Sequence, residues 1–442
     1  MNQSQTNASI TNSAFLLNIN KNEFSIAPFT SSNLAVYLPI TSNKLFSNKT
    51  SNGKFSVDLQ DIYLSARRKN IFFLQSDLKL FSFSGANRKF NWNISVQERI
   101  EGGLAFNKEA INFINLGNKA YLNESIKMNF PIHFLHFRSF NFTLAKQFNS
   151  KLDVGLTMKM YLGRSLLNVN STFDFFTEQN GEYVNIDIKG KGRVSSPISL
   201  NNLLNGNAFD LSLSNYLFCL RNPGLGLDFG LRYEINDDIN FNASVQDLGF
   251  IYWNKNTTKF NTDGVYEWNG VDISGKLDFK KLSAIKENNT IETFRDSFLN
   301  GLIVPVDGNI FTFLPSQINI GINYYYFNQF NFAASVHTQL IQNFLRVNLA
   351  FSGSYLLNQN LTLLSGLSLS NLSYVNVPLG LAFKNKKFGA SLSVGNVFSV
   401  LFPSRSHYFG GSFNLSYRLG KFVRVNNQHF KDFPFFQKRI IH

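Results

Sequence analysis

The sequence predicts an all-β fold, a single antiparallel transmembrane β-barrel of about 14 strands with short helices and long loops. The first observation is a hairpin at residues 224–253, where apolar and polar side chains alternate along two arms around a polar turn. Alternation places the apolar side chains on one face of a strand, and each arm approaches the ~9–11 residues that a tilted strand needs to cross a bilayer. The second is that the alternation returns in seven segments from residue 317 onward. The third is that no apolar run approaches the ~18 residues of a membrane-spanning helix.

The composition favours the same class. Only 16% of the 442 residues are charged, whereas Phe occurs 48 times. Phe, Leu, Asn and Ser recur in a two-residue rhythm, and helical windows rich in Ala, Glu and Lys are scarce. A soluble secreted β-sandwich would share the alternation, so it remains an alternative that predicts extraction without detergent.

The chain is expected to divide into a mobile or plugging N-terminal segment (1–32), an outer-membrane β-barrel (33–420) and a basic, aromatic C-terminal tail (421–442). The first part is rich in Asn and Ser and has no strong period. It lacks the basic start and the apolar core of a secretory signal. An outer-membrane location therefore requires a signal that is not visible in this sequence. Either the signal has been removed, or the start of the sequence was assigned too late to include it.

The first half of the barrel is expected to mix strands with short helices. Residues 33–41 form a first strand, and residues 58–68 a short amphipathic helix. Strands follow from Phe73 and from Phe90. Residues 107–117 form a second helix, because apolar side chains recur at near-helical spacing and a Gly ends the run.

A further hairpin begins at His136, and one or two strands are expected around Phe173 and Ile186. Residues 254–316 are irregular and contain a helix candidate at 283–298. We expect a long loop or an insertion into the lumen there. The seven segments from residue 317 onward are joined in part by tight turns, which predicts an up-and-down meander.

The faces opposite the apolar rows carry Asn, Ser, Gly and ions, which suit a hydrated lumen better than a dry core. Charged and amide residues on these faces are the candidates for lining the lumen. They are Asp77, Lys79, Gln97, Arg99, Asp228, Arg232, His337, Gln339, Arg346, Lys384 and Arg418.

A dense charge group, Glu98, Arg99 and Glu101, precedes two glycines. Arg99 and Glu101 share the lumenal face, and Glu98 points outward near the membrane edge. One interpretation of the group is structural, as an ion ladder between strands or a strand end. The other is functional, as a gate or a ligand contact.

Two other groups are separated by strand geometry. Asp228 and Arg232 share a face but lie ~13 Å apart, so any ion pair must be cross-strand. His133 and His136 fall on opposite faces, which disfavours a shared metal ion.

Signals for catalysis are absent from the sequence. It has no Gly-x-Ser-x-Gly elbow, no phosphate-binding loop, no HExxH and no Cys cluster. We expect no enzyme activity, no metal and no cofactor. The net charge of +14 is scattered without a stripe, so anionic lipid or lipopolysaccharide is the expected partner rather than nucleic acid. Cys219 is expected to be a small apolar residue of the wall.

Two stretches carry a resemblance: SVQERIEGGLAFNKEAINFINLGN at 95–118 and SVQDLGFIYW at 244–253. They resemble segments of a large family of Bacteroidota outer-membrane proteins, a domain of unknown function that is similar to long-chain fatty-acid transporter barrels. The resemblance implies an outer-membrane barrel and supplies neither substrate nor catalytic residues. The chain departs from it in lacking a visible signal and in continuing beyond Gly420.

These observations lead to three functional hypotheses. The first is a non-enzymatic outer-membrane barrel, a porin-like channel or transporter for a small hydrophobic molecule, with residues 1–32 or 254–316 as a plug or gate. The second is a scaffold or accessory partner of a secretion or gliding machinery, which binds a protein through the tail. The third is a barrel phospholipase.

Overall fold

The computed structural model describes residues 11–18, 22–45, 58–87, 89–179, 183–197, 221–268, 303–327, 329–341, 344–385 and 387–419. Their strands join one antiparallel sheet that closes on itself. Within these ranges, no helix has both the length and the apolar character needed to cross a membrane.

Fourteen strands form the closed wall, so the predicted barrel and its strand number are confirmed. The ring closes because β1 pairs with β2 on one edge and with β20 on the other. In ring order the wall consists of β1 (Asn22–Tyr37), β2 (Lys69–Ala86), β3 (Asn91–Asn107), β5 (Ile132–Gln147), β6 (Leu152–Thr177), β8 (Pro223–Glu234), β9 (Ile239–Trp253), β13 (Gln317–Tyr326), β14 (Phe330–Ile341), β15 (Phe344–Leu356), β16 (Leu361–Ser370), β18 (Leu379–Lys384), β19 (Phe388–Val394) and β20 (Tyr408–Leu419).

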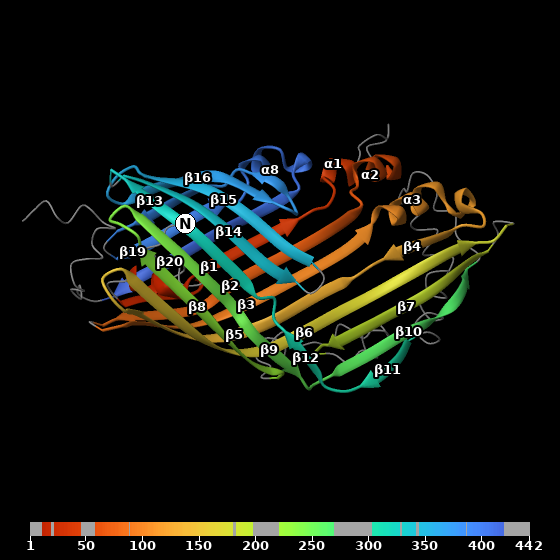
Figure 1. Cartoon of the computed structure of the whole chain (residues 1–442), viewed down its shortest axis with the longest axis horizontal. Coiled ribbons are helices and arrows are strands. Elements are labelled where there is room, and N and C mark those ends of the chain that lie inside the picture. Colours follow the sequence, from red (N-terminus) through yellow and green to blue (C-terminus); the bar gives the residue numbers. More distant parts are fainter. Residues whose placement is uncertain are drawn as a thin grey trace, which may run out of the picture.

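The two ends of the barrel differ. Tight turns such as 148–151, 235–238 and 357–360 join neighbouring strands at one end, which we call the turn end. The described helices other than the 3-10 helix η2 (Ser13–Asn18) gather at the opposite, helix end (Figure 1). They are α1 (Ser42–Leu45), α2 (Leu59–Ser65), α3 (Lys108–Leu116), α8 (Val397–Leu401), η3 (Asn118–Tyr121) and η5 (Pro403–Arg405).

A tongue of sheet extends the wall at the helix end. The first half of β6 pairs with β8, whereas its second half pairs with β7 (Val184–Ser195) and β4 (Ser125–Asn129). β10 (Thr257–Trp268) pairs with β7, and β11 (Ile303–Asp307) pairs with β10. Two short strands, β12 (Ile310–Phe313) and β17 (Tyr374–Asn376), complete the sheet by pairing with β9 and β16.

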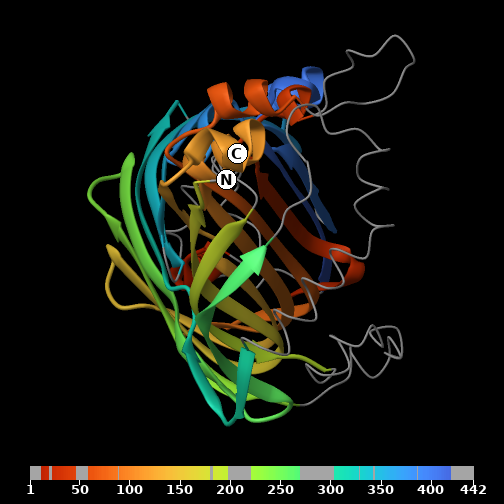
Figure 2. The same ribbon diagram turned by 90° about the vertical axis from the view of Figure 1, so that its right-hand side faces the viewer.

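The pattern of exposure follows the sequence alternation. In β8, Leu225, Leu227 and Phe229 are 61%, 40% and 47% exposed, whereas Asp228 and Arg232 of the alternate row are 3% and 5% exposed. Strand side chains alternate between faces, so the apolar row points away from the ring and the polar row points into it. Figure 2 looks into this ring of strands.

Both helices predicted in the first half are confirmed. α2 begins after Asp58, whose carboxylate accepts a hydrogen bond from the backbone N–H of Asp61 at 3.1 Å, as an N-cap does. α3 ends at Gly117, whose φ of 76° lies in the region that favours glycine.

The first strand begins earlier than predicted, at Asn22 rather than residue 33, and ends at Tyr37. Its pairing with β2 shifts register between Ile26 and Ser31, and Pro28 lies in the shift. A bulge and a proline interrupt the two-residue period, which is why the alternation was not visible there. The part of the chain predicted as a plug therefore contributes wall from residue 22 onward.

Residues 254–316 were predicted to be irregular, yet β10, β11 and β12 fall within them. The helix candidate at 283–298 and the tail at 421–442 lie outside the described residues.

Closure of the ring gives a first prediction. In detergent, the unboiled protein is expected to migrate differently from the boiled protein, because every wall strand has two hydrogen-bonded neighbours and the barrel stays folded until heated. A chain truncated before Tyr408 lacks β20, leaves one edge of β1 and one edge of β19 without a partner strand, and is expected to show no shift. Electrophoresis checks both, and a shift in the truncated chain would contradict closure by β20.

Candidate functional site

The described part of the N-terminus, residues 11–18, which we call the N-terminal segment, lies inside the ring at the turn end. It contains the 3-10 helix η2 (Ser13–Asn18). Asn12 Nδ2 donates hydrogen bonds to the carbonyl oxygens of Leu231 at 3.0 Å and Ala243 at 3.2 Å. Ser13 Oγ and Thr157 Oγ1 are 2.8 Å apart. The segment is thus bound to β6, β8 and β9, and Asn12 and Ser13 are almost fully buried.

Two glycines make room for this segment. A Cβ at Gly155 would overlap the backbone of Ser13, and a Cβ at Gly230 would overlap the side chain of Asn12. Any larger residue would push the segment off the wall. The alternation explains the placement, because both glycines lie on the inward face of their strands.

A buried ion cluster lies farther along the interior, centred on Asp247. Its carboxylate accepts hydrogen bonds from Arg99 Nη1 at 2.5 Å, Lys159 Nζ at 2.7 Å and Tyr161 OH at 3.1 Å. Its backbone N–H donates to Asp228 Oδ1 at 2.8 Å, and Lys159 also pairs with Asp228 at 2.7 Å. The cluster joins β3, β6, β8 and β9.

A bulge turns Asp247 inward. Its φ is 56°, and the pairing of β8 with β9 shifts register between Leu227 and Phe229. Along β9, the apolar row that includes Val245 would continue to position 247 on the outer face. The extra residue of a bulge changes the direction of the side chain and brings this carboxylate into the ring.

A second group of polar side chains crosses the interior. Gln339 Nε2 on β14 donates to Glu101 Oε2 on β3 at 2.8 Å, although β5, β6, β8, β9 and β13 separate these strands along the wall. Arg346 Nη1 on β15 donates to Gln339 Oε1 at 3.1 Å and to Gln75 Oε1 on β2 at 2.8 Å. These bonds connect opposite sides of the ring.

The two groups form one network, which we call the polar septum. Gln75 Nε2 donates to Asp77 Oδ2 at 3.0 Å, and Arg99 Nε donates to Asp77 Oδ1. The polar septum consists of Gln75, Asp77, Arg99, Glu101, Lys159, Asp228, Asp247, Gln339 and Arg346.

Two buried apolar clusters adjoin the polar septum. One contains Leu135, Phe137, Tyr161, Leu166, Ile251, Trp253, Ile310 and Leu314. The other contains Tyr37, Phe73, Ile341 and Leu372, with Phe344 and Tyr408 packed against it. Both include ring-facing side chains, so the interior combines charged and apolar surfaces.

The structure brings six of the eleven predicted lumen residues into one network: Asp77, Gln97, Arg99, Asp228, Gln339 and Arg346. Gln97 joins through Asp77 at 3.4 Å. Lys79 is buried on β2, and His337 Nδ1 lies 2.6 Å from Asn319 Oδ1 on β13. Their expected role in lining a pathway stays a prediction.

The other three candidates lie at the turn end. Arg232 pairs with Asp153 on β6 at 2.5 Å, so its ion pair is cross-strand as expected. Arg418 Nη1 donates to the carbonyl oxygen of Asn385 at 2.7 Å, and Lys384 is the last residue of β18 before that turn.

Neighbouring charges separate by face as the strand period predicts. Glu98 lies on the face opposite Arg99 and forms ion pairs with Arg138 at 2.6 Å and His136 at 3.1 Å. His133 instead lies 3.4 Å from Glu101, inside the ring. The two histidines therefore have different carboxylate partners. Among the described residues, no group of three His, Cys, Asp or Glu is placed to hold a metal ion.

The sequence reasoning missed Asp247 and Lys159. Lys159 alternates with Met158 and Met160, so the polar row of its strand contained the signal. The signal for Asp247 was the break that it makes in the apolar row of β9. A charge on an outward face is costly, and such a break indicates a bulge.

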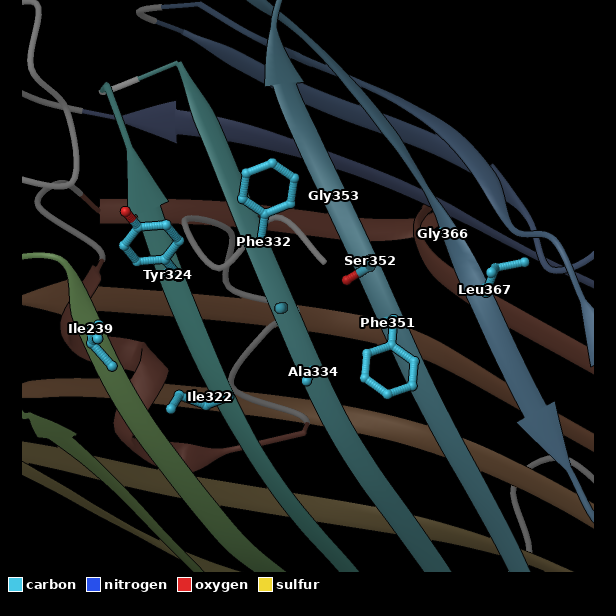
Figure 3. Close-up of a pocket in the computed structure, with 11 residues that line it drawn as sticks. Ile239, Ile322, Tyr324, Phe332, Ala334, Phe351, Ser352, Gly353, Gly366 and Leu367 are labelled. Carbon is cyan, nitrogen blue, oxygen red and sulfur yellow. The ribbon is translucent and has the colours of Figure 1, made fainter.

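An apolar groove lies on the other side of the wall. It is lined by side chains from β9 and β13 to β16, among them Tyr324, Phe332, Phe351 and Leu367 (Figure 3). These four belong to the exposed outer rows, so the groove belongs to the outer surface rather than to the interior.

Fold and interior together define a closed antiparallel barrel with an apolar outer face and a charged interior that is bridged across the ring. The chain belongs to a family of unknown function, DUF5723, whose model matches residues 14–393. The family expected from the two sequence stretches is confirmed, whereas the expected Bacteroidota origin stays a prediction. No curated protein matches the chain.

Solved barrels with similar folds have low sequence identity. The toluene transporter TodX of Pseudomonas putida is 11% identical, with a TM-score of 0.43 and coverage of 95% of both chains. The toluene transporter TbuX of Ralstonia pickettii is 12% identical, with a TM-score of 0.41 and coverage of 94% of this chain and 93% of that chain. A FadL homologue of Pseudomonas aeruginosa is 9% identical, with a TM-score of 0.44 and coverage of 94% of both chains.

Proposed function

We propose that the protein is a non-enzymatic outer-membrane barrel that passes a small hydrophobic molecule. The observation that carries the proposal is the combination of an apolar outer wall with an interior that is closed only by noncovalent contacts. Ring-facing hydrogen bonds can exchange partners without unfolding the wall, so a passage can open and close.

The outer wall supports a place in the membrane. Exposed apolar side chains recur along the wall strands, including Leu225, Phe229, Ile320 and Phe351 at 61%, 47%, 46% and 59% exposure. Large contiguous apolar surface is rare on proteins surrounded by water and suits acyl chains. The turn end would then face the periplasm and the helix end the exterior, as in bacterial barrels with short periplasmic turns. Lipid and lipopolysaccharide would contact the outer rows.

The interior supports two closures in series. The N-terminal segment closes the turn end through the hydrogen bonds of Asn12 and Ser13. The polar septum closes the interior farther in, and the two apolar clusters offer surfaces to which a hydrophobic molecule can bind. In this proposal the segment is the gate at the turn end, and the septum prevents the free passage of ions.

The alternative hypotheses gain no specific support. The tail that would dock a protein partner lies outside the described residues, and so does most of the 254–316 region that was expected as a second gate. His136 lies opposite Ser165 in the pairing of β5 with β6, but nothing in the described residues favours a phospholipase over a channel.

A reversible lock on the N-terminal segment tests the gate. In a chain with Cys219→Ser, the double variant Ser13→Cys with Thr157→Cys places two thiols where the hydroxyl oxygens are 2.8 Å apart. Oxidation is expected to stop uptake of a hydrophobic dye into liposomes, because the disulfide holds the segment against β6. Reduction is expected to restore uptake to the unlocked rate.

A second disulfide provides the matched control. The Oγ atoms of Ser393 and Ser412 are 2.6 Å apart on neighbouring wall strands, so the corresponding cysteine pair cross-links the wall without touching the segment. Its oxidation is expected to leave uptake unchanged. Equal uptake by the oxidised and reduced forms of the Ser13→Cys, Thr157→Cys chain would refute gating by the segment.

A further inference from the structure

Several buried polar atoms in and beside the polar septum have no hydrogen-bond partner among the described residues. They are Glu101 Oε1, both ring nitrogens of His133, and Arg346 Nε. His133 Nε2 and Glu101 Oε1 are 3.4 Å apart, but they are not aligned for a hydrogen bond. Glu101 is 0% exposed and His133 is 7% exposed. Buried polar groups in proteins are normally paired, so this cluster needs a further partner.

The cluster lies between the two apolar clusters of the interior. Glu101 is opposite Leu135 in the pairing of β3 with β5, and Leu135 belongs to one apolar cluster. Gly103, two residues farther along β3, is opposite both His133 and Phe73, and Phe73 belongs to the other apolar cluster. Apolar walls with a few convergent polar groups are typical of small-molecule sites.

Gly103 leaves room for a methyl-sized group beside His133. A Cβ at this position would be in ordinary van der Waals contact with the carbonyl oxygen of Phe72 and the Phe73 ring, both at 3.6 Å, and with the Phe344 ring at 3.8 Å. This differs from Gly155 and Gly230, where a Cβ would overlap the N-terminal segment. The space at Gly103 is therefore bordered by two aromatic rings and by His133.

We propose that Glu101 and His133 bind the hydroxyl group of an uncharged apolar molecule, an alkylphenol or a fatty alcohol, whose apolar body contacts Phe73 and Phe344. A hydroxyl oxygen can donate to Glu101 Oε1 and accept from a ring nitrogen of His133. A hydroxyl with bonds of about 2.8 Å and near-tetrahedral geometry bridges atoms roughly 4.5 Å apart, so small rotations of the two side chains would widen their present 3.4 Å separation when the molecule binds. This inference rests on the proposed function, because the molecule must enter the ring.

The same atoms disfavour a carboxylate ligand. A second carboxylate beside the buried Glu101 would add like charge in a site of low polarity. Arg346 cannot compensate by a paired contact, because its Nη1 bonds Gln75 and Gln339 and its Nη2 bonds Tyr37. Only Nε is left, and a bidentate pair with a carboxylate needs two nitrogens. A hydrocarbon would leave all the polar atoms unpaired.

Three probes with one apolar body test the site. Dissociation constants of 4-hexylphenol, hexylbenzene and 4-hexylbenzoate are measured by calorimetry on the full chain in lipid nanodiscs, with empty nanodiscs as the correction for partitioning. We expect the phenol to bind about tenfold more tightly than either other probe, as one or two net hydrogen bonds would give. Equal binding of phenol and hydrocarbon, with water alone satisfying the polar atoms, would overturn the proposal, and so would tightest binding of the benzoate.

Two variants separate the polar and apolar parts of the site. His133→Phe is expected to reduce the preference for the phenol to within about twofold of hexylbenzene. Gly103→Leu fills the space and is expected to abolish binding of all three probes. The mobility shift on boiling shows that each variant is folded. If His133→Phe keeps the full preference, or if Gly103→Leu binds normally, the assignment is wrong.

The binding test is independent of the transport test. Preferential binding of the phenol by a protein that moves no dye into liposomes would refute the proposed passage and leave the hydroxyl site intact. Dye uptake without any preference among the probes would refute the hydroxyl site and leave the passage intact.

Discussion

Replacement of Asp247 by alanine is expected to lower the free energy of unfolding by about 3–5 kcal/mol, the usual effect of removing one partner from a buried ion pair. Arg99 and Lys159 both donate to this carboxylate and are themselves almost fully buried. Without the Asp247 carboxylate, Arg99 keeps its ion pair with Asp77, and Lys159 keeps its ion pair with Asp228. Each of these buried cations then has one fewer anionic partner. Urea unfolding in lipid vesicles, followed by tryptophan emission, measures the change.

An exposed ion pair provides the control. Asp187 and Lys189 are 2.9 Å apart on β7, and the lysine side chain is 66% exposed. Exposed pairs contribute little because water screens them, so Asp187→Ala is expected to unfold at the same urea concentration as the unchanged protein. A small effect of Asp247→Ala, similar to that of the control, would mean that Asp247 does not support the fold.

Replacement of Gly155 by valine is expected to expel the N-terminal segment from the ring while the wall stays folded. The new side chain would occupy the position of Ser13 and Ala14. Valine suits a strand, and Gly155 is in regular antiparallel pairing, so the wall itself tolerates the change. With Ser13→Cys as a reporter and Cys219→Ser, the rate of labelling by a water-soluble thiol reagent is expected to rise by about 100-fold, as the loss of two to three hydrogen bonds would give.

Gly353 provides the matched glycine for this experiment. A Cβ there would contact only the Phe332 ring, at 3.6 Å, so Gly353→Ala is expected to leave the labelling rate unchanged. Slow labelling in the Gly155→Val chain would show that the segment does not depend on the space at this glycine. Loss of the mobility shift on boiling would show that the wall had been disrupted instead.

Local pattern alone was sufficient for the wall. The hairpin of β8 and β9, the seven strands from residue 317 onward and the helices α2 and α3 occur where side-chain period and end signals placed them. The period of two is a property of each strand and needs no knowledge of its neighbours. The start of β1 was missed, because a bulge near Pro28 removes that period.

The interior depended on more than local pattern. The sequence placed Arg99, Asp228, Gln339 and Arg346 on inward faces, but the face of a strand does not identify the partner of a side chain. Asp247 could be found only as a break in an apolar row, since a bulge reverses its direction. The position of the N-terminal segment inside the ring depends on Gly155 and Gly230, which lie in strands far from the segment in the sequence.

The sequence by itself determined that this protein has strands with one apolar and one polar face, in a number that can close a ring. Alternation and strand length can be read from consecutive residues without knowledge of the neighbouring strands. The tertiary structure decided which polar groups meet. Closure brings β3 opposite β14, and only then does Glu101 reach Gln339 across the interior. Such contacts depend on the register and curvature of all the strands between them, and no single stretch of sequence contains that information.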